Sequence, residues 1–143
     1  MHPDATVDSR PRAPARSIHL AAWVAQALLA AAFLMAGFAK LTSPVEALAA
    51  QMPWVTGAMG RFVRLIGAVE IAGALGLLLP AATRIQPRLT VLAALGLAVV
   101  MVLAAITHAS RGEWAGIVAN VVLGGLAAFV LWARSSKAPI RPR

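Results

Sequence analysis

The stretch LTVLAALGLAVVMVLAAITHAS, residues 89–110, decides the fold class, because it contains no charged side chain from end to end. A helix needs about 20 apolar residues to cross the hydrocarbon core of a bilayer. Two further stretches, 17–39 and 114–133, are also uncharged, and 65–83 carries one charge, Glu70. The sequence therefore predicts an all-α integral membrane protein, a four-helix bundle with helices at about 18–40, 62–80, 89–109 and 114–133.

The composition excludes most soluble folds. Of the 143 residues, 60% are hydrophobic and only 13% are charged, whereas an ordinary globular domain has about 25% charged residues. A soluble bundle of helices would need a wide polar face on each helix, and none of the four stretches has one. Because cysteine is absent, the chain has no disulfide, no thiolate metal site and no dithiol redox pair.

Proline and a short turn mark the boundaries between the predicted helices. Pro44 follows the first helix, and Pro87 comes just before the third. We expect Pro80 to close the second helix, since proline ends or kinks helices. The turn 111–113, Arg-Gly-Glu, separates the third helix from the fourth.

The two ends of the chain differ from the predicted transmembrane domain, 17–134. Residues 1–16 and 135–143 are polar and rich in proline, and they cannot bury enough apolar area to offset the entropy of ordering. Both are therefore expected to be mobile tails. A cleaved signal peptide is the alternative interpretation of the first apolar stretch, but that stretch is longer than the usual 7–15 residues of such a peptide.

The basic residues predict the orientation of the chain. An even number of spans places both termini on one side of the membrane. That side would carry nine of the 13 basic residues: Arg10, Arg12, Arg16, Arg84, Arg88, Arg134, Lys137, Arg141 and Arg143. The other side would carry Lys40, Arg61, Arg64 and Arg111. Because cytoplasmic loops carry the excess of Lys and Arg, we expect cytoplasmic termini and a multi-pass protein of the cell (inner) membrane. No basic stripe is interleaved with aromatic residues, so nucleic acid is not expected as a partner.

The longest connection, 41–61, is predicted to lie on the outer side. It is mostly apolar, and the segment 44–52 suits a short helix in the membrane interface. Two interpretations stay open for this outer loop. It is either an interfacial anchor, with Trp54 among the lipid headgroups, or a lid formed by Met52, Pro53 and Trp54 over a lipophilic ligand such as a quinone.

Each predicted helix contributes one polar side chain to the outer half of the bundle. These residues are Lys40, Glu70, His108 and Asn120. An ionisable group inside the membrane is costly, at about 2.5–3.5 kcal/mol on insertion scales, so it marks a candidate site. Small residues one turn away from each of the four permit close helix packing. We therefore predict an intramembrane polar cluster or ligand-binding site formed by these four residues.

Two interpretations of this polar cluster stay open. If Lys40 reaches Glu70, the two form a neutral interhelical pair that fixes packing. Otherwise Glu70 handles a proton or binds a ligand, with His108 as partner. Arg64 is predicted to turn away from Glu70 and snorkel outward. His19 and His108 lie at opposite ends of the membrane, which speaks against a bis-His haem. No metal-ligand spacing, phosphate loop or nucleophile–base set is present, so the catalytic residues stay unknown.

Several short motifs resemble the DoxX-like family of small membrane proteins. They are FLMAGFAKL (33–41), MPW (52–54), RLIGAVEIAGA (64–74) and AAITH (104–108), followed by Asn120. The resemblance covers about residues 20–133 and implies a four-helix membrane bundle. It also implies a role beside membrane redox complexes, because the family's namesake is similar to a small subunit of a thiosulfate:quinone oxidoreductase. Distant animal relatives look like membrane assembly chaperones.

These observations lead to one functional hypothesis and two alternatives. The hypothesis is an accessory or quinone-interacting subunit of a membrane redox system, with the lipid bilayer, a quinone or other lipophilic ligand, and a membrane or peripheral redox protein as partners. The first alternative is a non-enzymatic membrane partner or assembly protein. The second is a proton-coupled transporter of a small molecule, because Glu70 lies near the membrane midplane.

Overall fold

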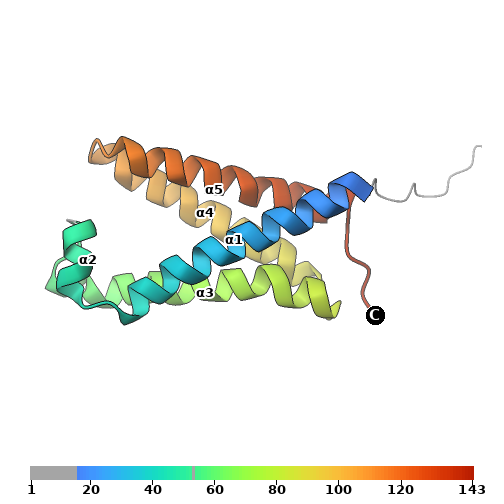
Figure 1. Cartoon of the computed structure of the whole chain (residues 1–143), viewed down its shortest axis with the longest axis horizontal. Helices are drawn as coiled ribbons and strands as arrows, with labels where there is room; N and C mark the ends of the chain where they lie inside the picture. Colours follow the sequence, from blue (N-terminus) through green and yellow to red (C-terminus); the bar gives the residue numbers. More distant parts are fainter. Residues whose placement is uncertain (1–15, 53) are drawn as a thin grey trace, which may run out of the picture.

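The computed structural model describes residues 16–52 and 54–143, and this part of the chain is helical apart from short connections and the C-terminal segment 138–143. The elements in chain order are α1 (Arg16–Thr42), α2 (Val45–Gln51), η1 (Gly57–Met59), α3 (Gly60–Thr83), α4 (Arg88–Ser110), α5 (Trp114–Trp132) and η2 (Ala133–Lys137). Four helices are long and apolar enough to cross a membrane: α1, α3, α4, and α5 continued by η2 (Figure 1). The predicted all-α architecture with four spans is confirmed. Residues 1–15 of the predicted N-terminal tail, and Pro53, lie outside the described residues.

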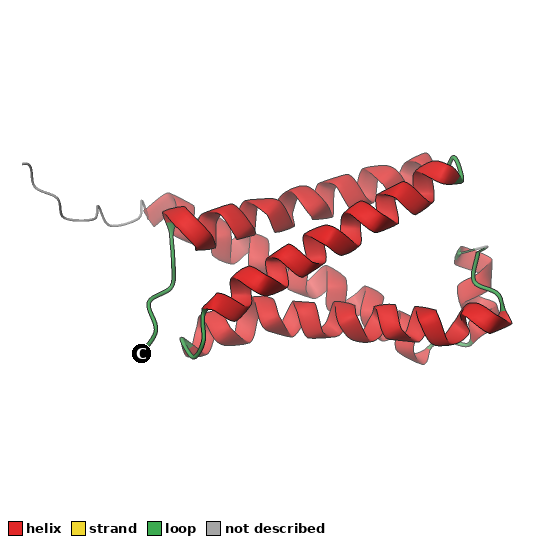
Figure 2. Ribbon diagram, turned by 180° about the vertical axis from the view of Figure 1, so that it is seen from behind, coloured by secondary structure: helices red, strands yellow, loops and turns green. Residues whose placement is uncertain are grey.

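The four long helices form a closed ring of contacts. α1 packs on α3, α3 on α4, α4 on α5, and α5 returns to α1. The core between them is built from apolar side chains such as Leu29, Phe33, Leu77, Leu97 and Val130. Because each helix runs opposite to the next one, the start of α1 and the end of α5 lie at the same end of the bundle (Figures 1 and 2). We call this the termini end, and we call the opposite end, with α2 and the turn 111–113, the loop end. The side of the membrane on which the termini end lies stays a prediction of the charge distribution.

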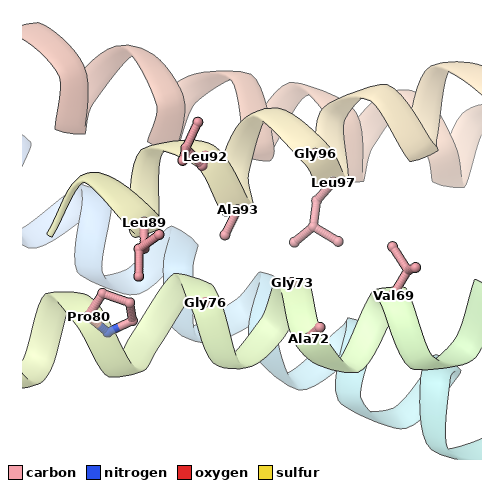
Figure 3. A pocket seen from close by; sticks show the side chains of 10 residues that line it. All are labelled: Val69, Ala72, Gly73, Gly76, Pro80, Leu89, Leu92, Ala93, Gly96 and Leu97. Atoms are coloured by element: carbon pink, nitrogen blue, oxygen red, sulfur yellow. The ribbon is translucent and has the colours of Figure 1, made fainter. Parts of the chain in front are cut away.

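The prediction that Pro80 closes the second helix is wrong. Pro80 lies inside α3, which continues to Thr83. A proline removes one helical hydrogen bond, but neighbouring helices can hold the helix together in a membrane protein. Here Pro80 lies beside Leu89 of α4 in the groove between the two helices (Figure 3). The helix ends one turn later, because Arg84 takes a left-handed backbone conformation with φ of 61°.

Large apolar side chains cover the outside of the bundle. Met35, Leu65, Val102 and Trp114 are all more than half exposed, and they lie on four different helices. In water such a surface would drive aggregation, whereas in a bilayer it contacts lipid tails. The exposed surface is therefore the lipid-facing surface of a membrane protein.

The outer loop folds back on the start of α3. Leu48 of α2 and Val55 are buried against Val63 of α3, and Met52 and Trp54 pack partly buried on this small cluster. The expected short helix forms as Val45–Gln51. The loop thus has its own apolar contacts at the loop end, close to the point where α1 ends and α3 begins.

Candidate functional site

Lys40 and Glu70 form an ion pair between α1 and α3. The Lys40 Nζ atom donates to both carboxylate oxygens of Glu70, at 2.9 Å to Oε1 and 2.8 Å to Oε2. The Glu70 side chain is only 4% exposed, and that of Lys40 is 18% exposed. The two opposite charges compensate one another, which removes most of the cost of burying either alone.

The pair forms where α1 and α3 come into backbone contact. Gly37 lies one turn before Lys40, and Gly67 lies one turn before Glu70, and the two glycines face one another across the helix crossing. Any larger residue at either glycine would hold the helices apart. The sequence places small residues at both positions, so the two charged side chains can meet at hydrogen-bond distance.

Arg64 reaches the end of α1, so the prediction that it turns outward is wrong. One terminal nitrogen of its guanidinium donates to the backbone carbonyl of Lys40, and the other donates to the carbonyl of Ser43 at 2.6 Å. The last carbonyls of a helix lack intrahelical partners, and a cation is favourable beside them. These carbonyls attract the Arg64 side chain more than the lipid interface does. Arg64 therefore fixes the backbone that carries Lys40.

Among the described residues, the ammonium group of Lys40 uses two of its three N–H bonds. An ammonium has three donors, and the two contacts to Glu70 use two of them. Since Lys40 is the more exposed member of the pair, the third N–H is the part of the pair that an arriving molecule can reach. Chemically, this is a neutral ion pair that offers one hydrogen bond to an acceptor.

His108 and Asn120 lie on a different interface, between α4 and α5. The Nδ1 atom of His108 is 2.6 Å from Oε2 of Glu113, and Arg111 donates to the other Glu113 oxygen at 2.7 Å. The hydrogen bond from Arg111, and then that of His108, hold the pKa of the Glu113 carboxyl below its usual value. The imidazole lies directly over Gly116 of α5, where an added Cβ would clash with the ring.

Asn120 lies on the same face of α5 as Gly116 and Gly124, which pack on His108 and Met101 of α4. Its Nδ2 atom is buried and has no hydrogen-bond partner among the residues that the structure describes. The side chain is thus directed into the α4–α5 interface.

The structure places Lys40 and Glu70 at the α1–α3 contact, and His108 and Asn120 at the α4–α5 contact. Within residues 16–52 and 54–143, no hydrogen bond or ion pair joins Lys40 or Glu70 to His108 or Asn120. Figure 1 shows the α4–α5 turn apart from α2 and the adjoining ends of α1 and α3. The Lys40–Glu70 ion pair is more buried than the contact between His108 and Glu113, and it is the candidate functional site.

An apolar groove runs along α3 and α4 from Val69, next to Glu70 in the sequence, to Pro80 and Leu89 (Figure 3). Its volume is about 390 Å³, and small residues such as Gly73 and Ala93 form much of its wall. The groove faces the lipid and suits a hydrocarbon chain. In the described part of the chain, no group of three or more His, Cys, Asp or Glu residues is arranged to hold a metal ion.

Sequence reasoning missed a second buried polar cluster, at the termini end. Gln26 and Arg134 are both buried and hydrogen-bonded to each other. The charge distribution predicts Arg134 only as one of the nine basic residues on the side of the termini, and no predicted feature involves Gln26. The available signal was a glutamine in the middle of an apolar stretch, which needs a polar partner on another helix.

The structure describes two of the three loop residues that were predicted to form a lid. Met52 and Trp54 pack on the cluster of Leu48, Val55 and Val63, and Pro53 lies outside the described residues. The lid stays a prediction, since these contacts suit an interfacial anchor equally well.

The sequence was also compared with known proteins. The model of the DoxX-like family matches residues 24–130, which is most of the described helical part. Comparisons with curated proteins and with solved structures find no match. The matched region includes α3 and α4 and most of α1 and α5, and it contains Lys40, Glu70, His108 and Asn120. The chain therefore belongs to the DoxX-like family of membrane proteins.

Proposed function

We propose that this chain is an accessory subunit of a membrane redox system and that the Lys40–Glu70 pair binds the head group of a quinone. The observation that carries the proposal is the third N–H of the Lys40 ammonium, which the carboxylate of Glu70 leaves free on the more exposed side of the pair.

A quinone suits this site by its chemistry. Its carbonyl oxygen accepts a hydrogen bond and carries no charge, so it can approach a neutral ion pair without adding a charge to the membrane interior. Its isoprenoid tail is a hydrocarbon chain, as the groove between α3 and α4 requires. The groove includes Gly73, one turn after Glu70 on α3, so the tail would pass from the α1 side of α3 to its α4 side at this level.

The accessory role rests on the family to which the chain belongs and on the absence of a recognisable catalytic set in the sequence. A quinone held by one hydrogen bond is bound and positioned, while a partner protein would exchange electrons with it. The chain is thus proposed to hold or deliver quinone rather than to oxidise or reduce it.

Binding of a short-chain quinone to the purified chain tests the proposal. We expect the quinone to raise the melting temperature, which the tryptophans report by fluorescence, and an alkylbenzene of similar size to raise it less. The Lys40→Met/Glu70→Leu double variant removes the donor without leaving a buried charge unpaired. This variant should keep the fold, and quinone should no longer raise its melting temperature more than the alkylbenzene does.

The matched control is Thr107→Val, near the loop end of α4. The Thr107 hydroxyl is exposed and bonded to the Leu103 carbonyl of its own helix, so its loss should leave quinone binding unchanged. An equal quinone effect in the double variant would remove Lys40 and Glu70 from the site. Equal effects of quinone and alkylbenzene on the unchanged chain would exclude a specific quinone site.

The non-enzymatic partner protein stays a second candidate because of α5. This helix is the least buried of the four spans, and it leaves a large apolar face, including Val118 and Val121, open to lipid or protein. Photo-crosslinking from Val121 in native membranes tests this alternative, which predicts capture of one defined membrane protein. Crosslinks to lipid alone would count against it.

A further inference from the structure

The buried polar cluster at the termini end is short of hydrogen-bond acceptors. Arg134 is 3% exposed, although it carries a permanent positive charge. Its Nε atom donates to Oε1 of Gln26 at 2.6 Å, and one terminal nitrogen, Nη1, lies 3.2 Å from both the Ala138 carbonyl and the Nδ1 atom of His19. The other terminal nitrogen, Nη2, is buried and has no hydrogen-bond partner among residues 16–52 and 54–143. A guanidinium has five N–H donors, so both donors on Nη2 are unused.

The neighbours of Arg134 add further donors rather than acceptors. Trp23 directs its indole N–H at the Nε2 atom of His19, at 3.2 Å, while Arg134 approaches the other ring nitrogen. An imidazole has at most one free lone pair, so His19 can accept from only one of these two groups. The amide nitrogen of Gln26 is already bonded to the Leu77 carbonyl at 2.5 Å. The N–H donors in this cluster therefore outnumber the acceptors.

The charge of Arg134 also finds no counter-ion in the described part of the chain. Among residues 16–52 and 54–143, no carboxylate side chain forms an ion pair with it. The indole ring of Trp23, 5.2 Å from the guanidinium carbon, compensates only part of the charge. A buried cation that has unused donors and no anion is destabilising unless an acceptor from outside completes it.

Other basic residues gather at the same end. Arg84, in the connection between α3 and α4, donates from Nε to the Arg141 carbonyl at 3.1 Å, and its own carbonyl accepts from the Arg143 amide at 3.3 Å. These contacts draw the C-terminal segment across the termini end, towards the end of α3 (Figures 1 and 2). Arg16 at the start of α1 and Arg88 at the start of α4 lie at this end as well. The surroundings of Arg134 are thus strongly positive.

We propose that Arg134 forms the base of an anion site that takes a phosphate group at the termini end of the bundle. A phosphate supplies acceptor oxygens and negative charge, the two things that the cluster lacks. Basic pockets between transmembrane helices bind phospholipid head groups in this way. The phosphate reaches Nη2 by displacing the segment after Ala138, whose contacts with the α3–α4 connection are the two hydrogen bonds of Arg84.

The sources of the phosphate can be separated in uncharged detergent. The full chain is titrated with phosphatidylglycerol, with an uncharged galactosyl diacylglycerol at the same mole fraction, whose head group carries no phosphate, and with inorganic phosphate. The melting temperature is measured by fluorescence and the bound lipid by native mass spectrometry. A head-group site predicts preferential binding of phosphatidylglycerol, and a site for the free ion predicts a shift with inorganic phosphate. Equal binding of the two lipids together with no effect of phosphate would overturn the proposal.

Arg134→Gln should weaken the binding of phosphatidylglycerol by about tenfold, because a charge-assisted hydrogen bond is lost. The matched control is Arg61→Gln, which removes the same charge from an exposed residue at the loop end and should leave this binding unchanged. An equal loss of affinity for phosphatidylglycerol in the two variants would mean that only net charge attracts the lipid, contrary to the proposal. If Arg134→Gln does not fold, the lipid comparison on the unchanged chain still decides.

Discussion

Gly37 and Gly67 bring the backbones of α1 and α3 into contact, each against the carbonyl oxygen of the other. A Cβ atom on Gly37 would lie 2.7 Å from the Gly67 oxygen, and one on Gly67 would lie 2.8 Å from the Gly37 oxygen. Lys40 and Glu70 follow these glycines by one helical turn on the same faces. The contact between the glycines therefore sets the separation at which the ammonium and the carboxylate meet.

Gly67→Ala should push α1 and α3 apart and destabilise the bundle by roughly 1–3 kcal/mol, the usual effect of overpacking. The matched control is Gly125→Ala on α5, where an added Cβ meets nothing within 4 Å. This control should be neutral or slightly stabilising, since alanine favours a helix more than glycine does. Unfolding in mixed SDS micelles measures both changes. Equal stability of the two variants would contradict the close contact.

A double-mutant cycle on Lys40 and Glu70 should show strong coupling. Lys40→Met leaves the carboxylate of Glu70 buried without a partner, at a cost of about 3 kcal/mol. Glu70→Leu should cost less, because the more exposed Lys40 side chain can extend towards the interface. The double variant should lie close to the unchanged chain in free energy of unfolding. If the losses in free energy of unfolding of the two single variants add up to that of the double variant, the two residues do not interact.

Arg64→Met should destabilise the loop end by about 1–2 kcal/mol, because two carbonyl groups at the end of α1 lose a charged donor. Hydrogen exchange of the amides around Lys40 and Ser43 should become faster, while exchange in the middle of α4 stays the same. Arg61→Met, on the exposed side of the same helix turn, serves as the control. Unchanged exchange at residues 40–43 in Arg64→Met would contradict the capping role.

The turn between α4 and α5 should loosen in acid. The Arg111 and His108 contacts lower the pKa of Glu113 in the folded state, so the stabilisation is present above the pKa of the unfolded chain. It is lost as the pH falls through the lower, folded value, that is, below about pH 4.5. Amide exchange at residues 111–113 should therefore increase in this range, and Glu113→Gln should remove that increase. A rise of equal size in the variant would exclude Glu113 as its cause.

The sequence predicted the spans well, because length and lack of charge decide whether a segment can cross a bilayer. It failed at Pro80, which lies inside α3, since packing against neighbouring helices lets a membrane helix tolerate a proline and leaves no local pattern in the sequence. The location of both termini at one end of the bundle was predicted from the even number of spans.

The site was predicted only in part for a similar reason. Lys40 and Glu70 stand out as charges in apolar stretches, and glycines one turn away indicate a helix contact. Gln26 and Arg134, by contrast, are far apart in the chain. The sequence pattern around an arginine at the end of a span does not indicate whether its side chain faces lipid or the bundle interior. Only the packing of α1 against α5 brings these two residues together.

The most direct test of the central claim is the amount of quinone that copurifies with each chain. The protein is extracted gently from its native membrane, and quinone per chain is measured by solvent extraction and mass spectrometry for the unchanged chain and for Lys40→Met/Glu70→Leu. The Lys40–Glu70 site predicts a stoichiometric amount in the first and a large loss in the second. Equal amounts in both, or no quinone with the unchanged chain, would contradict it.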